Sequence, residues 1–417
     1  MAPALVHAEE TSELESGQTV IDAVGGAAVA CIGNGHPVVK QAIKDQRLTL
    51  SLDVYNMQLS NEPAEALAKY LVETSNGAFE MVGFVSGVLP RNRSATTQEL
   101  HCASIVVPRK YSRDSIFSVS PYSQGAPAYA ARFKKSGETD GQYVDRLRQE
   151  LDDKFVELGP DTVIGCRGRS CRRDRSGRNH RGSRCTGRLF QGHEIGVRQI
   201  WRLVHPRRSM GSTHAWETLG DGIAPDIQAV AKGLGGGYDI CSSCNAPMPI
   251  QFRRYASIGA VLISKKVAEG IRGKSGLWKH GHTYQAHPLA CAASLAVQQV
   301  IKSENLLENI RTQGAYLDKL LNDRLRGPNS LAAPFTFDIR GAGGSGGWNL
   351  TSKCPRARAL KNGLVIMGFG GGSNLEATKG DHLILAPAYN VTKEEIEIIV
   401  DIFMHSVEEV ISEYSTA

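Results

Sequence analysis

The stretch GIAPDIQAVAKGLGGGY, residues 222–238, is the most informative part of the chain. It places Lys232 between two small residues and follows it with Gly-Leu-Gly-Gly-Gly, so the lysine has little side-chain cover at a tight turn. For an average lysine, a solvated side chain in a glycine-rich loop is the simpler interpretation. Two further segments favour a functional lysine at this position.

The first of these segments is KHGHTYQAHPLACAA, residues 279–293, which joins a His/Thr-rich turn to the start of an apolar helix. Such a turn suits anion binding through a hydroxyl group and backbone N–H groups. The second is IDAVGGAAVACIGNGHPVVKQAIKDQ, residues 21–46, a distinctive N-terminal segment.

The residue pattern between these segments predicts an α/β fold with a mainly parallel sheet, because strands and helices alternate with glycine-rich joints. Helices are predicted where apolar residues recur on one face, and strands where short apolar runs occur. A capping box, Thr392-x-x-Glu395, begins a helix with Ile396, Ile399, Val400, Phe403, Val407 and Val410 on one face. The other predicted helices span residues 59–74, 143–156 and 288–301, and strands span residues 81–86 and 256–264.

Taken together, the three segments resemble the class III aminotransferases, which are pyridoxal 5'-phosphate enzymes of fold type I, and they occur in that family's order. The resemblance covers residues 20–87, about 122–164, 210–238, 255–341 and 357 to the end. It implies a large cofactor-binding domain, residues 52–300, with a mainly parallel central sheet. It also implies a small α/β domain built from residues 1–51 and 301–417.

The resemblance also implies roles for individual residues. Lys232 matches the lysine that binds pyridoxal phosphate as a Schiff base, and a lysine amine with a lowered pKa suits that chemistry. Thr283, beside His282, matches the threonine that reaches the cofactor phosphate of a neighbouring subunit, which implies a homodimer. Ser86 and Gly87 match the first two residues of the family's phosphate-binding loop, Ser-Gly-Gly-Ser-Glu-Ala, but the match to this motif ends after Gly87.

The net charge of +6 is concentrated in residues 166–208, which contain thirteen Arg against one Asp and one Glu. This segment has a net charge of +11, so the rest of the chain has a net charge of −5. An Arg-rich nucleic-acid segment, a metal knuckle and a stretch that never evolved as protein are the alternatives. Aromatic residues are absent from the Arg-rich run, and its Cys and His spacings match no zinc pattern.

The family needs an Asp-Glu-Val strand in this region, whose Asp pairs with the pyridinium nitrogen, and the chain lacks it. Read one nucleotide later, codons for residues 200–209 can encode Tyr-Gly-Ala-Leu-Phe-Ile-Leu-Asp-Glu-Val. A similar shift over residues 344–352 yields a strand with alternating apolar residues. Residues 239–254 interrupt a sequence that is continuous in the family, as a retained short intron would. We therefore expect a fungal gene with mis-spliced or frameshifted segments, of which 166–208 and 239–254 are the aberrant ones.

Several other features predict no separate function. The chain has no long apolar run or secretory signal, which predicts a cytoplasmic protein without a membrane partner. No metal site is expected, since Cys241 and Cys244 form a CxxC without a second pair. The GxGxxG at residues 341–346 precedes no helix, so it does not predict nucleotide binding. Cys31, Cys291, His214 and His287 are interpreted as structural residues.

The predicted activity is transfer of an amino group from an amine or amino acid to a 2-oxo acid, with pyridoxal phosphate bound to Lys232. An inactive aminotransferase-like scaffold is the alternative, and an Arg-rich nucleic-acid-binding protein is a remote one. The turn at residues 383–389 contains no Arg, so the substrate cannot be identified from a carboxylate clamp. The wording of residues 279–293 and 379–392 is similar to fungal members, which suggests specialised metabolism.

Overall fold

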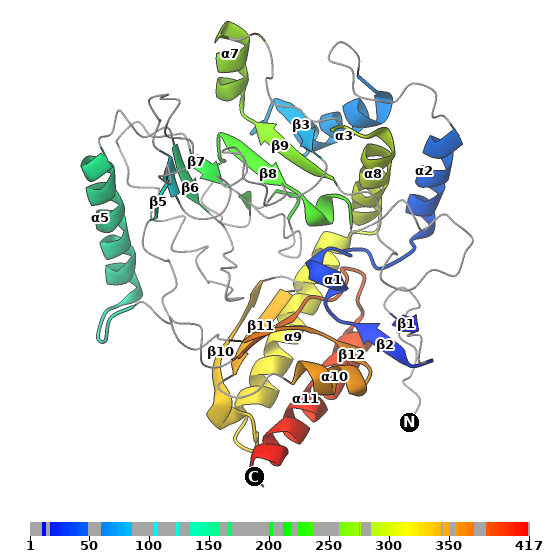
Figure 1. Ribbon diagram of the computed structural model, residues 1–417, viewed down its shortest axis with the longest axis vertical. Coiled ribbons are helices and arrows are strands. Elements are labelled where there is room, and N and C mark those ends of the chain that lie inside the picture. The colour runs from blue at the N-terminus through cyan, green and yellow to red at the C-terminus, as the bar shows by residue number, and fades with distance from the viewer. Residues whose placement is uncertain are drawn as a thin grey trace, which may run out of the picture.

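A computed structural model describes seventeen stretches of the chain. They are residues 11–13, 17–48, 60–85, 104–106, 122–124, 134–158, 165–168, 200–202, 212–214, 216–217, 224–236, 258–274, 276, 285–342, 345–350, 355–370 and 381–415. The described part has a large sheet with flanking helices at one end and two smaller sheets with helices at the other (Figure 1). Both the first strands and the last helix lie at this second end.

The large sheet has seven described strands in the order β3-β9-β8-β7-β6-β4-β5. Their bounds are β3 Met81–Val85, β4 Ser104–Val106, β5 Tyr122–Gln124, β6 Gly165–Gly168, β7 Ile200–Arg202, β8 Ile227–Val230 and β9 Gly259–Ile263. β6, β7 and β8 are parallel, whereas β3, β9, β4 and β5 join by antiparallel pairings. Of the seven described strands, β3, β5, β6, β7 and β8 run in one direction, as the predicted mainly parallel sheet requires, and β9 and β4 run in the opposite direction. The direction of a strand depends on whether the chain enters it from the same end of the sheet as the preceding strand or from the opposite end. Local residue patterns do not specify this.

The predicted helices around this sheet are present. α3 spans Glu62–Glu73, and its N-cap Asn61 accepts a hydrogen bond from the backbone N–H of Ala64. α8 spans Pro288–Ser303 and is buried on most of its surface, as its small apolar residues predict. α5 spans Asp140–Leu158, so it begins three residues before the predicted start. α7, Lys265–Lys274, follows β9, and α2, Pro37–Leu48, packs beside α8.

The second end contains a three-stranded sheet, β1-β2-β12, and a four-stranded antiparallel sheet, β10-β11-β14-β13. The strands are β1 Thr11–Glu13, β2 Thr19–Asp22, β10 Thr336–Ala342, β11 Ser345–Leu350, β12 Leu364–Val365, β13 Met367–Gly370 and β14 Asp381–Leu385. The helices are α1 Gly25–Ala28, α9 Leu306–Arg326, α10 Arg356–Lys361 and α11 Lys393–Ser415. β2, near the N-terminus, pairs in parallel with β12, 343 residues later at Ile21 and Leu364.

The capping box of α11 is confirmed. The backbone N–H of Thr392 donates to Glu395 Oε2 at 2.8 Å, and the backbone N–H of Glu395 donates to Thr392 Oγ1 at 3.2 Å. Of the predicted apolar face, Val410 is only partly buried, and Ile411 takes the buried position instead. The drift follows from the 3.6-residue helical period over a helix of this length.

Two large apolar clusters make up most of the core in the described part of the chain. The larger joins N-terminal residues such as Ile21, Val39 and Ile43 to residues of α8, α9 and α11. The other lies between α3, β3, β9 and the α8 residues Ala290 and Cys291. α8 therefore packs into both clusters and connects the large sheet to the part built from both ends of the chain.

Within the described residues, no helix is both long enough and apolar enough to cross a membrane. No group of three or more His, Cys, Asp or Glu side chains in those residues could hold a metal ion.

Candidate active site

Lys232 lies directly after β8, at the start of a single 3-10 turn, Lys232–Leu234. Its backbone has φ +54°, the left-handed region that a lysine rarely adopts, and Gly236 follows with φ +63°. Such a conformation costs about 1–3 kcal/mol and persists only where surrounding structure imposes it. Ala231, Gly233 and Leu234 are buried while the Lys232 residue is half-buried, so the side chain starts from a firmly packed turn.

Hydrogen bonds close this turn and attach it to distant parts of the chain. Within the turn, the N–H of Gly235 donates to the carbonyl of Lys232 at 3.0 Å. From α8, Gln298 Nε2 donates to the carbonyls of Gly233 at 3.3 Å and Leu234 at 2.7 Å. Cys31 Sγ, from the N-terminal segment, also donates to the Gly233 carbonyl at 3.6 Å. Sequence reasoning missed Gln298, although a glutamine in a fully buried helix was the available signal.

The predicted cofactor-binding residues Ser86, Gly87, His282 and Thr283 lie outside the described residues. The elements beside two of them are described. β3 ends at Val85, one residue before Ser86, in the same sheet as β8.

α8 begins shortly after the His282–Thr283 pair, with His287 as N-cap and Pro288 in the first turn. The preceding residue, Ala286, has φ +51°, and its carbonyl accepts a hydrogen bond from Asn61 Nδ2 at 3.0 Å. This bond holds the start of α8 against the start of α3.

His214 has both ring nitrogens in hydrogen bonds, which agrees with its interpretation as a structural residue. Nε2 pairs with Thr74 Oγ1 and Nδ1 with Gln228 Nε2, each at 3.2 Å. The His214 ring also lies 5.9 Å from the ring of Phe79, and the residue is 1% exposed. His214 therefore connects β8, the strand that precedes Lys232, to the end of α3.

Cys31 and Cys291 are core residues, as predicted. Both side chains are buried, and neither forms a disulfide. Burial raises the pKa of the Cys291 thiol to about 12, so it stays protonated and is a poor nucleophile near neutral pH.

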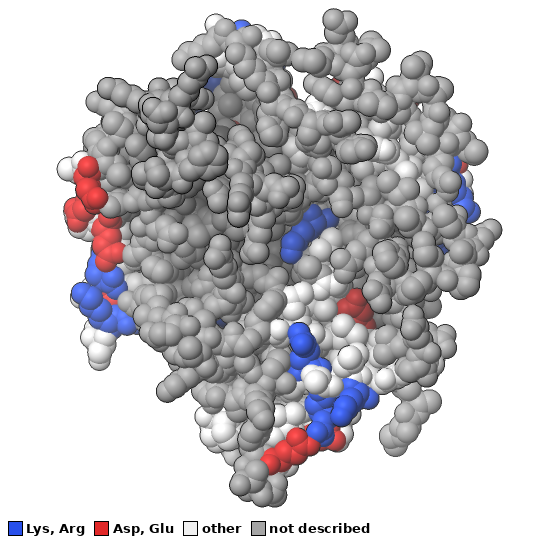
Figure 2. Space-filling view, in the orientation of Figure 1, with Lys and Arg blue, Asp and Glu red and all other residues white. Residues whose placement is uncertain are grey.

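Several of the described Lys and Arg side chains form ion pairs with Asp or Glu. On the face shown in Figure 2, Lys and Arg lie beside Asp and Glu at α5 and near the C-terminal helix. Arg324–Asp401 and Arg358–Glu413 are such pairs. Most of the Arg-rich segment lies outside the described residues.

The described residues fit covalent attachment of pyridoxal phosphate. A lysine amine at a constrained, half-buried turn is the group that the cofactor's aldehyde requires. Asp226 cannot supply the acid for the ring nitrogen, because it precedes β8, at the opposite end of the strand from Lys232, and accepts a hydrogen bond from Ser264 Oγ. The parallel neighbour of β8 is β7, and in the sequence it is followed by Leu203, Val204 and His205, none of which is acidic.

Comparison with known proteins identifies the family. The family described as aminotransferase class-III matches residues 209–407. An aminotransferase of Gibberella zeae is 30% identical, over 95% of this chain and 82% of its own length. An uncharacterized aminotransferase of Schizosaccharomyces pombe is 28% identical, over 96% and 91%, and acetylornithine aminotransferase 1 of Bordetella pertussis is 27% identical, over 92% and 89%.

Solved structures agree on the fold. The ω-transaminase of Pseudomonas jessenii, in a structure with PMP, superposes with a TM-score of 0.73 at 20% identity, over 97% of this chain and 92% of that one. The chain belongs to the class III aminotransferases, which are pyridoxal-phosphate-dependent enzymes of fold type I. Its predicted fold class, activity and cofactor are thereby confirmed.

Proposed function

We propose that Lys232 is the catalytic lysine of this aminotransferase and that it binds pyridoxal phosphate covalently. The observation that supports this most strongly is the constrained turn after β8, with φ +54° at Lys232 and three side-chain hydrogen bonds to the next two carbonyls. When bound, the cofactor supplies an electron sink for the bond at the substrate α-carbon. Lys232 Nζ would then move the proton between the substrate α-carbon and the cofactor's C4′ carbon.

We further propose that Ser86, Gly87, His282 and Thr283 bind the cofactor, and that Thr283 reaches its phosphate from the neighbouring subunit of a homodimer. The positions of β3 and α8 support this, because each element borders one of these two segments along the chain. The amino donor is an amine or amino acid and the acceptor a 2-oxo acid. A cytoplasmic location and a role in fungal specialised metabolism complete the proposal, and the relatives from Schizosaccharomyces pombe and Gibberella zeae are consistent with a fungal source.

Trapping with borohydride tests the role of Lys232. The purified chain is incubated with pyridoxal phosphate and reduced, and the modified peptide is located by mass spectrometry. We expect the label on Lys232, loss of the label in Lys232→Ala, and a loss of amino-transfer rate of at least about a hundredfold. Lys265→Ala is the control, because Lys265 is exposed on α7. Equal labelling of Lys232→Ala and the unchanged chain would contradict the assignment.

The domain division of the sequence, 1–51 with 301–417 and 52–300, remains part of the proposal, as do the aberrant segments. Two observations support a reading-frame change in 166–208. The family match begins at residue 209, and a short strand, β7, stands beside β8 where the family's Asp-Glu-Val strand is expected. We expect the transcript to encode an Asp after that strand and to lack codons 239–254. A cDNA that matches all 417 residues would refute this and would favour the inactive scaffold.

A further inference from the structure

Gln298 is a polar side chain in the middle of the buried helix α8. It is 0% exposed, and its neighbours Val297 and Ala296 belong to the larger apolar cluster. Burying a primary amide is unfavourable unless it is hydrogen-bonded, and an apolar side chain of similar size would avoid that cost. The contacts of Gln298 therefore indicate what it does.

Both contacts are to the turn that begins at Lys232. Gln298 Nε2 donates to the carbonyl of Leu234 at 2.7 Å and to that of Gly233 at 3.3 Å. A 3-10 turn leaves its last carbonyls without intrahelical partners, so these acceptors are available. One amide group thus pairs with the two residues that follow the lysine.

The helix that contains Gln298, α8, is bound to α3. The backbone carbonyl of Gln298 accepts a hydrogen bond from Tyr70 Oη on α3 at 3.3 Å, and α3 packs against α8 in the second apolar cluster. The turn also contacts the N-terminal segment through Cys31, whose carbonyl accepts from the N–H of Tyr389 at 2.8 Å. The lysine turn is therefore fastened to two parts of the core from different regions of the sequence.

We infer that Gln298 is a positioning residue, which keeps Lys232 in its left-handed conformation and so directs its amine. The inference rests on the proposed function of Lys232. Without the two donated hydrogen bonds, the lysine backbone relaxes toward negative φ, which is favoured for any residue except glycine. The Lys232 amine would then lose the orientation that the turn imposes on it, and it would react more slowly with the cofactor's aldehyde.

Hydrogen exchange of the cofactor-free chain tests the first half of the inference. Gln298→Met removes the donors at nearly constant volume, and Gln299→Met is the matched control, because Gln299 is exposed on the same helix. We expect exchange of the Leu234 and Gly235 amides to be about tenfold faster in Gln298→Met, and unchanged in Gln299→Met. Equal exchange in the two variants would overturn the inference. If Gln298→Met does not fold, Gln298→Asn, whose amide is one methylene shorter, replaces it in the comparison.

Borohydride trapping of pyridoxal phosphate at Lys232 tests the second half. We expect Gln298→Met to label Lys232 several-fold more slowly than Gln299→Met, and Gln298→Glu to recover part of the rate at acid pH, where the protonated carboxyl can donate one hydrogen bond. Faster exchange with unchanged trapping would overturn the positioning role and leave a purely structural one. Absence of trapping in the unchanged chain would refute the proposed function of Lys232, while the exchange comparison would still decide whether Gln298 holds the turn.

Discussion

Lys232 combines a left-handed backbone with a position directly after a buried strand, and neither property suits an ordinary surface lysine. The glycines after it were visible in the sequence as a sign of tight turning. The positive φ of the lysine could not be predicted from the sequence. A run of glycines indicates that the glycines themselves can adopt positive φ, but it does not indicate the backbone conformation of the preceding residue. The partner groups on Gln298 and Cys31 are 66 and 201 residues away in the chain, beyond any local pattern.

His214 provides a prediction at the same scale. His214→Leu leaves the buried Gln228 amide without its hydrogen bond to the ring, and an unsatisfied buried group costs about 1–3 kcal/mol. We expect the free energy of unfolding in urea to fall by at least about 1 kcal/mol. The comparison is His405→Leu on the exposed side of α11, which should change it by no more than about 0.5 kcal/mol. Similar values for both variants would show that the His214 network does not stabilise the fold.

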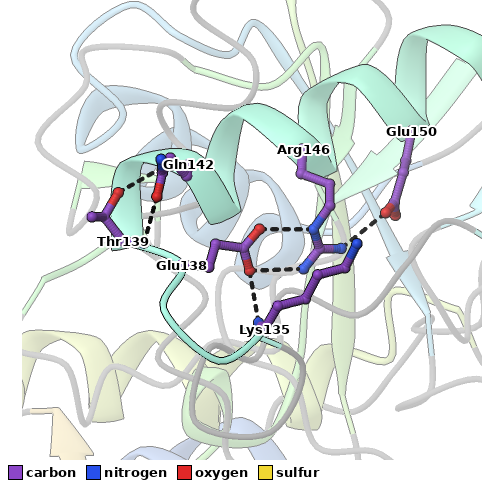
Figure 3. A network of polar contacts seen from close by, with 6 residues as sticks. All are labelled: Lys135, Glu138, Thr139, Gln142, Arg146 and Glu150. Carbon is purple, nitrogen blue, oxygen red and sulfur yellow. Dashed lines mark hydrogen bonds and ion pairs between the residues drawn. The ribbon is translucent and has the colours of Figure 1, made fainter.

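At the scale of elements, the start of α5 explains why that helix is longer than predicted. Thr139 and Gln142 form reciprocal side-chain to backbone hydrogen bonds at 3.2 and 2.8 Å (Figure 3). Arg146 donates to Glu138 through Nε at 2.8 Å and Nη2 at 3.1 Å, and its Nη1 donates to Glu150 at 2.9 Å. The pair Asp140-Gly141 is typical of a turn, but these contacts stabilise it as the first turn of the helix instead.

This network predicts a dependence of stability on pH. The hydrogen bonds from Arg146 hold the pKa of Glu138 at about 2, below its ordinary value of 4.5. Because the folded state favours the ionised carboxylate, Glu138 stabilises the protein above pH 4.5 and loses this effect as the pH falls from 4.5 toward 2.

Glu138→Gln should therefore be less stable than the unchanged chain at pH 6, and the difference should shrink on acidification to about pH 2 when followed by circular dichroism. Glu150→Gln, which removes the more exposed partner of the same guanidinium, is the control with the smaller expected difference. A difference between Glu138→Gln and the unchanged chain that stays constant from pH 6 to pH 2 would contradict the assignment.

At the scale of the whole molecule, the larger core joins segments from the two ends of the chain. Phe403 of α11 is 1% exposed in that cluster, which also contains Ile21 and Val39. Phe403→Ala removes a large buried ring, and such a change costs about 3–5 kcal/mol. That is a large fraction of the free energy of unfolding of a typical domain, which is roughly 5–15 kcal/mol. We therefore expect the N-terminal and C-terminal segments to unfold together at a lower temperature in Phe403→Ala.

Val156→Ala is the control for this prediction, because Val156 is 70% exposed on α5 and its truncation should change stability by less than about 0.5 kcal/mol. Hydrogen exchange would reveal whether residues 17–48 and 381–415 lose protection in parallel in Phe403→Ala. Loss of protection at the C-terminal segment alone would show that the two ends do not share one cooperative core.

Local patterns were sufficient for the family, for most helices and for the capping box of α11, since each depends on residues within a few positions of one another. They were also sufficient to mark Lys232 as the candidate catalytic residue. Strand direction in the large sheet, the hydrogen bonds of His214 and the contacts of Gln298 with the lysine turn depend on residues far apart in the chain. Their placement follows from how whole elements pack, because a buried polar group must find its partner wherever the fold brings one within about 3 Å.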